Sequence, residues 1–215
     1  KPEQNLGVQM RMTRKALKQS GAALEDAVRR DMNSAMGVAL DKAVFLGTGA
    51  NGQPLGVITG QSTYGITATA INAAVSWSAF RSAVVRFMTA NAAGGPGAVR
   101  LMIRPEVWSA LDGTLITDTA VSEWDRLIGN IPAGNIVMST NALAAPAGSP
   151  LETSALLTTS AGGVAPIFVG AWGAVDLIRD PFSDAQSGGL RLTALATVDV
   201  TVARPAQLEV LTDIQ

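Results

Sequence analysis

Hydrophobic and polar residues alternate in two well-separated parts of the chain. Over residues 6–12 and again over residues 190–202, every second residue is apolar, which is the period of a half-buried strand. At about 3.3 Å per residue, the second segment spans some 40 Å before Arg204 and Pro205 stop it. The alternation therefore predicts one strand near the start of the chain and one unusually long strand near its end.

A helical period follows the first strand. From Ala22 to about Leu46 the apolar residues recur at spacings of three and four, on one face of a helix: Leu24, Val28, Met32, Met36, Ala39, Leu40, Ala43 and Val44. Ser20 and Gly21 are predicted to precede this helix as its N-cap. The rod would be about 37 Å long. Its length matches the long strand, so the pair predicts a narrow, elongated domain.

Shorter elements are predicted between the long helix and the long strand. Residues 59–72 are interpreted as a connector, and Ser76 as the cap of a second helix that buries Trp77 and Phe80. Pro105 takes the first position of a short helix that reaches Leu111. Residues 112–124 show no regular pattern. Short strands are expected at residues 99–103, 136–139, 156–159, 167–170 and 174–179.

A glycine-rich turn follows the long helix. From Gly47 to Gly52 the residues match the G-x-G-x-x-G spacing of dinucleotide-binding loops. That fingerprint requires a strand before it and a helix after it, so that a helix N-terminus faces the pyrophosphate. Here the helix comes first, and Pro54 with Gly56 prevents another from following directly. A nucleotide-binding α/β enzyme that uses this loop is an alternative that the order of elements does not favour.

Composition limits the chemistry further. The 215 residues, enough for one large domain or two small ones, include no cysteine and no histidine, which excludes disulfides, thiolate zinc sites and histidine-dependent nucleophiles. A net charge of −1 gives no electrostatic argument for nucleic acid, and no segment approaches the roughly 18 apolar residues of a membrane span. Only 15% of residues are charged, against about 25% in an average domain. This composition fits either a large core or a surface covered by neighbouring subunits.

Few polar residues form candidate sites. Asp176 and Asp180 are the nearest carboxylate pair, but Arg179 beside them predicts an ordinary surface ion pair. Asp112 before Gly113 is interpreted as a turn former. A basic cluster ahead of the long helix is predicted to form a solvated or subunit-facing edge, with contact to DNA as the less favoured alternative: Arg11, Arg14, Lys15 and Lys18. We therefore expect no catalytic, cofactor-binding or metal-binding residues.

Four stretches are informative through their order and spacing. They are the long helix with Leu46-Gly47-Thr48-Gly49 and Gln53-Pro54-Leu55-Gly56; residues 99–108 with Arg104-Pro105; residues 127–139 with Gly129-Asn130-Ile131-Pro132; and residues 167–206 with Ile167-Phe168-Val169-Gly170 and Ala203-Arg204-Pro205. In these stretches the chain resembles the major capsid proteins of tailed bacteriophages, the family with the Hong Kong 97-like fold. The resemblance runs from about residue 6 to the end.

This resemblance implies an α+β fold with two domains. Residues 1–72 and 186–215 would form a peripheral domain on the long helix, called the spine helix, and residues 73–185 an axial domain. In the family, an N-terminal arm and an extended loop precede the strand that residues 6–12 resemble. Because the chain begins at Lys1, close to that strand, we expect a processed or trimmed product whose upstream sequence is missing.

The resemblance also implies a non-enzymatic, structural function. The chain would be a phage or prophage capsid subunit that self-assembles into pentamers and hexamers of an icosahedral shell, with non-specific contacts to the enclosed double-stranded DNA. Its partners would be a scaffold, a maturation protease and a portal. The subunit would assemble in the host cytoplasm and would be found in the virion. No cofactor or membrane is implied. An encapsulin, a related shell around cargo enzymes, is the alternative.

Some family members join their subunits by a lysine–asparagine isopeptide bond that a glutamate assists. No asparagine follows Asn141 here, and residues 190–204 contain no glutamate. We expect this chain not to form that bond.

Overall fold

The computed structural model describes residues 5–116 and 120–215. It divides into two compact units: unit 1 comprises Lys1–Gly56 and Val169–Val200, and unit 2 comprises Val57–Phe168 and Thr201–Gln215. Each unit is thus built from two segments that are distant in the sequence. The expected peripheral domain (1–72 and 186–215) and axial domain (73–185) refer to places in a shell, which a single chain does not test. That assignment stays a prediction.

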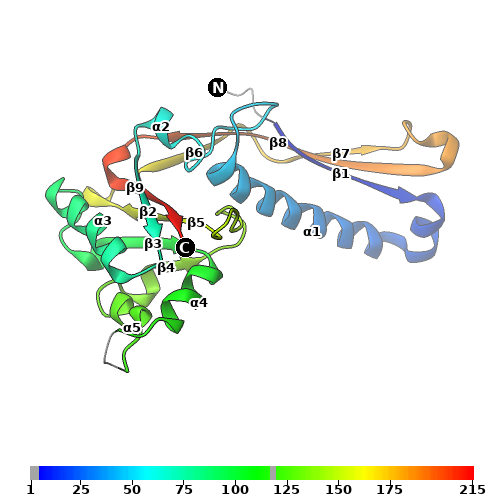
Figure 1. Cartoon of the computed structure of the whole chain (residues 1–215). Helices are drawn as coiled ribbons and strands as arrows, with labels where there is room; N and C mark the ends of the chain where they lie inside the picture. Colours follow the sequence, from blue (N-terminus) through cyan, green and yellow to red (C-terminus); the bar gives the residue numbers. More distant parts are fainter. Residues whose placement is uncertain (1–4, 117–119) are drawn as a thin grey trace. The chain divides into compact units, whose positions relative to one another are not determined.

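Unit 1 is a sheet with one long helix. Its elements are β1 (Asn5–Thr13), α1 (Arg14–Leu46), β6 (Ile167–Ala171), β7 (Asp176–Asp180) and β8 (Gly189–Val202), and β6 and β8 each continue into unit 2. The central strand is β8, with β1 antiparallel on one side and β6 and β7 on the other (Figure 1). The strands predicted from the alternation over residues 6–12 and 190–202 are confirmed.

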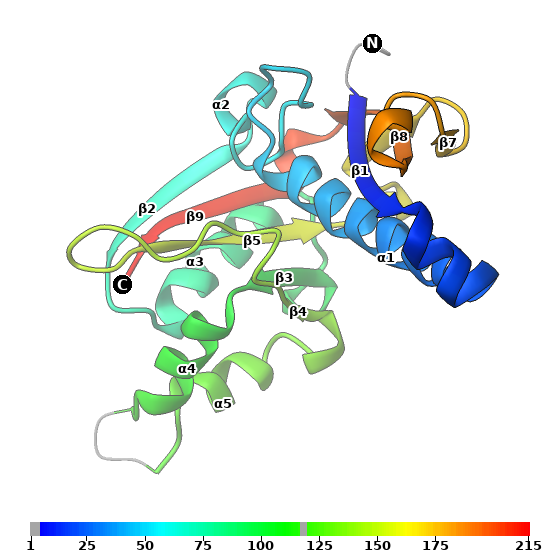
Figure 2. The same cartoon turned by 90° about the vertical axis from the view of Figure 1, so that its right-hand side faces the viewer.

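Helix α1 covers one face of this sheet because both carry apolar residues at matching positions. Met12 lies opposite Leu190 in the β1–β8 pair, and opposite residues share a face of the sheet. With the inner side of α1 they form one buried cluster: Met12, Val28, Met32, Met36, Leu190, Leu192 and Ala194. Figures 1 and 2 both show α1 lying along β1 and β8. The apolar stripe of the predicted helix is therefore its buried face.

The helix begins earlier than predicted. It starts at Arg14, and Ser20 and Gly21, which were expected to cap it, lie inside it. The N-cap is Thr13, whose hydroxyl accepts a hydrogen bond from the Ala16 N–H at 3.2 Å. A serine or glycine within a helix costs only about 0.5–1 kcal/mol, which packing along the rest of the helix overrides.

Unit 2 is a five-stranded sheet with several helices. Its elements are α2 (Gln61–Tyr64), β2 (Thr67–Ala73), α3 (Trp77–Thr89), β3 (Val99–Ile103), α4 (Pro105–Gly113), α5 (Glu123–Ile128), β4 (Ile136–Met138), β5 (Thr153–Thr159) and β9 (Leu208–Ile214). The strand order is β2-β9-β5-β3-β4, in which β2–β9 and β3–β4 are parallel pairs. Short 3-10 turns lie at Pro96–Ala98, Ala133–Asn135, Ala161–Gly163 and Pro205–Gln207, and in unit 1 at Ala185–Ser187.

The core of unit 2 contains the aromatic residues that the sequence placed there. Trp77 and Phe80 are buried with the apolar side chains of β3, β5, α4 and α5. Ser76 occupies the N-cap position of α3, as predicted, but its hydroxyl makes no capping bond. The Trp77 N–H instead donates to Oε2 of Glu123 at 2.8 Å, which links α3 to α5.

Four elements of unit 2 lie where none is predicted. The expected connector at residues 59–72 contains α2 and most of β2, α5 begins at the end of the irregular stretch 112–124 and continues beyond it, and β9 follows the long strand. Strand β2 is a mostly exposed edge and β9 is mostly buried, so neither shows apolar alternation. Helix α5 has a capping box, in which Ser122 and Asp125 each accept the other's backbone N–H.

A buried carboxylate joins β9 to α3 and β2. Glu209 is only 1% exposed. Its carboxylate accepts a hydrogen bond from Nε of Arg86 at 3.1 Å, a second one from the Arg86 guanidinium, and one from the Thr69 hydroxyl at 2.9 Å. The arginine therefore compensates a charge that would be costly to bury alone.

Replacing Arg86 with methionine is expected to lower the free energy of unfolding by about 3 kcal/mol, because Glu209 then stays buried without its cation. The double variant Arg86→Met with Glu209→Leu should regain much of that loss, since it leaves no unpaired charge. Urea denaturation of the unassembled chain measures both values. A double variant less stable than the single one would contradict this account.

Candidate functional site

An exposed apolar segment in unit 1 is the strongest candidate for a functional surface. Within residues 169–182, the apolar segment, six large apolar side chains are exposed: Val169, Trp172, Val175, Leu177, Ile178 and Phe182. A soluble monomer rarely exposes large apolar groups at such density, and such patches mark surfaces that another molecule covers. The segment includes part of β6, all of β7 and the first residues of the turn toward β8.

The apolar segment exposes side chains on both faces of its sheet. Leu177 lies opposite Ala194 and therefore on the face that α1 covers elsewhere, whereas Ile178 lies opposite Thr193 on the other face. Both Leu177 and Ile178 are nevertheless exposed. The unit's own helix therefore leaves these two side chains of β7 uncovered.

The turn between β7 and β8 holds Phe182 on an ordered backbone. We call residues 180–189 the tip. The carboxylate of Asp180 accepts hydrogen bonds from the N–H groups of Phe182 (2.8 Å) and Ser183 (3.1 Å) and from the Ser183 hydroxyl. The Ser183 hydroxyl is the main cause that lowers the pKa of Asp180, so this carboxyl is ionised at neutral pH. Phe182 itself is 84% exposed.

A second aspartate fastens the tip to β1. Arg11 and Arg191 lie directly opposite each other in the β1–β8 pair, where two like charges repel. Asp184, 8% exposed, binds both: its Oδ2 is 3.0 Å from Nε of Arg11 and 2.6 Å from Nε of Arg191. Hydrogen bonds from Arg191, followed by the charge of Arg11, lower the pKa of Asp184. Gly189 permits this packing, since a Cβ there would lie 2.8 Å from the Asp184 Cβ.

The carboxylates singled out in the sequence do not form the expected ion pair. Among the described residues, Arg179 pairs with Glu25 of α1 at 3.7 Å, not with Asp176 or Asp180. The register explains this, because Arg179 projects to the face of the sheet that α1 covers. Asp112 lies in the last turn of α4 and not in a separate turn.

The basic cluster is divided between a strand and a helix. Arg11 lies in β1 and pairs with Asp184, whereas Arg14, Lys15 and Lys18 lie in the first turns of α1, not ahead of the helix as predicted. Lys15 and Lys18 are exposed. Their role as a solvated or subunit-facing edge stays a prediction.

The glycine-rich turn reverses the chain after α1. Gly47 ends the helix, and the isolated bridge between Thr48 and Leu55 closes the turn. The Gly56 N–H donates to the Gly47 carbonyl at 2.9 Å, and a Cβ at either position would overlap backbone atoms. The next helix, α2, begins only at Gln61. These glycines therefore serve a close backbone approach, and no helix begins directly after the loop, as a nucleotide site would require.

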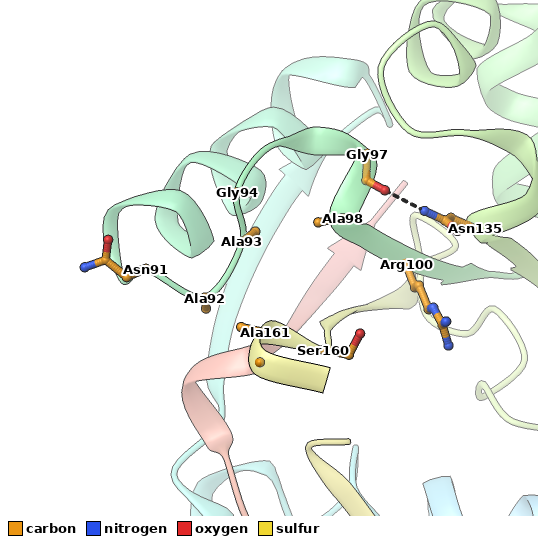
Figure 3. Close-up of a pocket in the computed structure, with 11 residues that line it drawn as sticks. Asn91, Ala92, Ala93, Gly94, Gly97, Ala98, Arg100, Asn135, Ser160 and Ala161 are labelled. Carbon is orange, nitrogen blue, oxygen red and sulfur yellow. Dashed lines mark hydrogen bonds between the residues drawn. The ribbon is translucent and has the colours of Figure 1, made fainter. Parts of the chain in front are cut away.

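A pocket of about 400 Å³ in unit 2 lies beside the end of α3 (Figure 3). Its lining is mostly alanine and glycine, and its one charged residue is Arg100. Asn135 points toward Gly97 and donates to that carbonyl at 2.9 Å, so its amide supports the fold. The lining contains no carboxylate and no nucleophile–base pair. This pocket therefore supplies no set of catalytic groups.

Neither a metal site nor a membrane span is found in the part of the chain that the structure describes. There, no three acidic side chains gather closely enough to hold a metal ion. No helix of that part is long and apolar enough to cross a bilayer.

The sequence and the fold were compared with known proteins. The model of the phage capsid family matches residues 2–213, and no curated protein matches the chain. The solved capsid of an empty GTA particle is 18% identical with a TM-score of 0.69, and the match covers 100% of this chain and 74% of that one. The structure from Mycobacterium phage Che8 is 18% identical with a TM-score of 0.62, and the match covers 98% of this chain and 71% of that one. A virus-like particle from Pyrococcus furiosus is 15% identical with a TM-score of 0.63, and the match covers 98% of this chain and 77% of that one.

At these identities the structural matches show the fold alone. They confirm the predicted α+β Hong Kong 97-like fold over nearly the whole chain.

Replacing Asp184 with asparagine is expected to lower the thermal stability of the chain at neutral pH, because Arg11 and Arg191 lose their shared counter-charge. The folded pKa of Asp184 lies below its ordinary value of 3.8, so its contribution is complete above that value and is lost as the pH falls through the folded pKa. The variant should therefore lose less stability than the unaltered chain as the pH is lowered below about 4.

Thermal unfolding followed by circular dichroism at several pH values measures this difference. The matched control is Asp176→Asn, which removes an exposed aspartate of β7 outside the tip. Identical pH profiles for Asp184→Asn and the unaltered chain would show that the two arginines do not depend on Asp184.

Proposed function

Since the chain belongs to the phage capsid family, we propose that it is the major capsid subunit of a tailed phage or prophage and is not an enzyme. It assembles by itself into pentamers and hexamers, which close into an icosahedral shell around double-stranded DNA. The GTA capsid that resembles it was computed with five-fold symmetry, which supports ring-forming contacts. The shell forms in the bacterial host cytoplasm and becomes part of the virion.

The observation that carries this proposal is the exposed apolar segment in unit 1. Trp172, Ile178 and Phe182 lie on strands and turns that the rest of unit 1 leaves uncovered. In a shell, neighbouring copies remove such side chains from water, at about 25 cal/mol for each Å² of apolar surface. A low fraction of charged residues also fits a subunit with much covered surface.

The DNA contacts of this shell are weak and non-specific. With a net charge of −1, the chain has no excess of cations to neutralise phosphates. Lys15 and Lys18 of α1 are exposed cations that a subunit or DNA can meet. Scaffold, maturation protease and portal complete the set of proposed partners.

Two alternatives receive less support. An encapsulin-type shell around cargo enzymes is a different use of the same fold, but the family that matches the sequence is a phage capsid family. A nucleotide-binding enzyme would need the Gly47 to Gly52 loop at a helix N-terminus, whereas this loop follows a helix C-terminus.

Electron microscopy of the full-length gene product, expressed alone and with its phage scaffold, tests the proposal. We expect closed shells, or rings of five or six subunits, and DNA inside particles recovered from phage-producing cells. Particles filled with enzyme would favour the encapsulin alternative. A monomer under every condition would contradict shell formation.

Denaturing gel electrophoresis tests the covalent state of those particles. Because no asparagine follows Asn141 and residues 190–204 lack glutamate, we expect boiling in detergent to release single chains. Covalent ladders in unmodified particles would show an inter-subunit bond that the sequence does not predict.

A further inference from the structure

The tip presents one large apolar side chain to its surroundings. Phe182 is 84% exposed, more than any other large apolar residue in the described part of the chain. Its backbone is fixed by Asp180, and the tip as a whole is tied to β1 through Asp184 and Arg11. An exposed phenyl ring on an ordered turn loses little conformational entropy when it enters a pocket.

A pocket of suitable size lies elsewhere in the same unit. Its volume is about 210 Å³, and it is lined by Leu6, Ala39, Lys42, Ala43, Leu46, Gly47 and Gln53. An apolar cavity of roughly 150 Å³ is large enough to bind benzene. The pocket can therefore receive one phenyl ring. We call it the α1 pocket.

Phe182 and the α1 pocket lie at opposite ends of unit 1. The tip ends at Gly189, which pairs with Thr13 at the start of α1, whereas Leu6 pairs with Ala196 and Leu46 is the end of α1. A helix of 33 residues is about 50 Å long. Figure 1 shows the β7–β8 turn and the C-terminal end of α1 at the two ends of this unit. The ring of one chain therefore reaches only the pocket of another copy.

Charge distinguishes the α1 pocket from a second apolar pocket. The ionised carboxylate of Asp180 lies beside Phe182 and would accompany the ring to the rim of any pocket. The α1 pocket has Lys42 in its lining, which attracts that carboxylate. A pocket of about 190 Å³ in unit 2 is lined by Val107 and Leu151 among others, but it includes the carboxylate of Glu106. Like charges oppose docking there.

We propose that Phe182 of one subunit inserts into the α1 pocket of a neighbouring subunit, with Asp180 facing Lys42. The contact joins two different surfaces of the subunit. The rotation between one subunit and the next then decides whether a series of such contacts closes into a ring or continues from one ring to another. This proposal rests on the proposed function, because it takes a second copy of the chain as the occupant. It names the residues through which two copies recognise each other.

A thiol-specific cross-link tests the contact directly. These 215 residues contain no cysteine, so Pro181→Cys beside Phe182 and Ala39→Cys in the α1 pocket add the only two thiols among them. A short bismaleimide added to assembled particles should join chains into a ladder on a denaturing gel. The matched control pairs Pro181→Cys with Ser34→Cys, a near-isosteric change about 140° around α1 from Ala39. Adding Phe182→Ala to the Pro181→Cys and Ala39→Cys pair should remove the ladder.

Assembly strength gives an independent measurement. Phe182→Ala and Lys42→Glu should each raise the protein concentration needed for assembly by about tenfold. The melting temperature of the unassembled chain should not change with Phe182→Ala, since the ring is exposed there. Lys42→Arg, which keeps the charge, should assemble like the unaltered chain.

The outcomes separate this contact from the function on which it rests. Absence of particles from the unaltered protein would refute the proposed shell. Normal particles that give no ladder, or the same ladder with Ser34→Cys, would overturn the Phe182 contact alone. Unchanged assembly of Phe182→Ala would overturn it as well.

Discussion

The packing of α1 against the β1–β8 sheet is the contact on which unit 1 depends. A single amphipathic helix and an isolated strand pair are each marginal in water, and only their apolar faces together form a stable core. Met32 and Leu192 lie in that core. Because the cluster runs along the sheet and one side of α1, it fixes the tip near one end of the helix and leaves the glycine-rich turn at the other. The positions of the candidate contact surfaces follow from this packing.

Periodic elements could be predicted from the sequence, and elements defined by their neighbours could not. The stripe through Val28, Met32 and Met36 and the alternation around Leu192 arise from burial on one face, which sequence spacing reports. Edge strand β2 and buried strand β9 lack such a period, and the start of α1 depends on a single hydroxyl, that of Thr13. Family resemblance supplied the overall fold where these local signals were absent.

The candidate site was beyond prediction for a related reason. Nothing in the spacing of residues 180–184 shows that Asp184 pairs with Arg11, which lies 173 positions away in the chain. Exposure of Phe182 is likewise a property of the folded unit. The low charge of the chain left open whether its apolar residues fill a core or cover a surface. The structure shows both: two buried clusters and an uncovered apolar segment.

The late position of β8 and β9 has a consequence for protein synthesis. The central strand of the unit 1 sheet, β8, and the strand between β2 and β5 in unit 2, β9, come after all of their partner strands, between Gly189 and Ile214. Neither sheet can close until residues 189–214 have left the ribosome, since a chain is synthesised from its N-terminus. A nascent chain that has not yet reached β8 therefore has no ordered tip. The order of the strands makes the tip one of the last features of unit 1 to form.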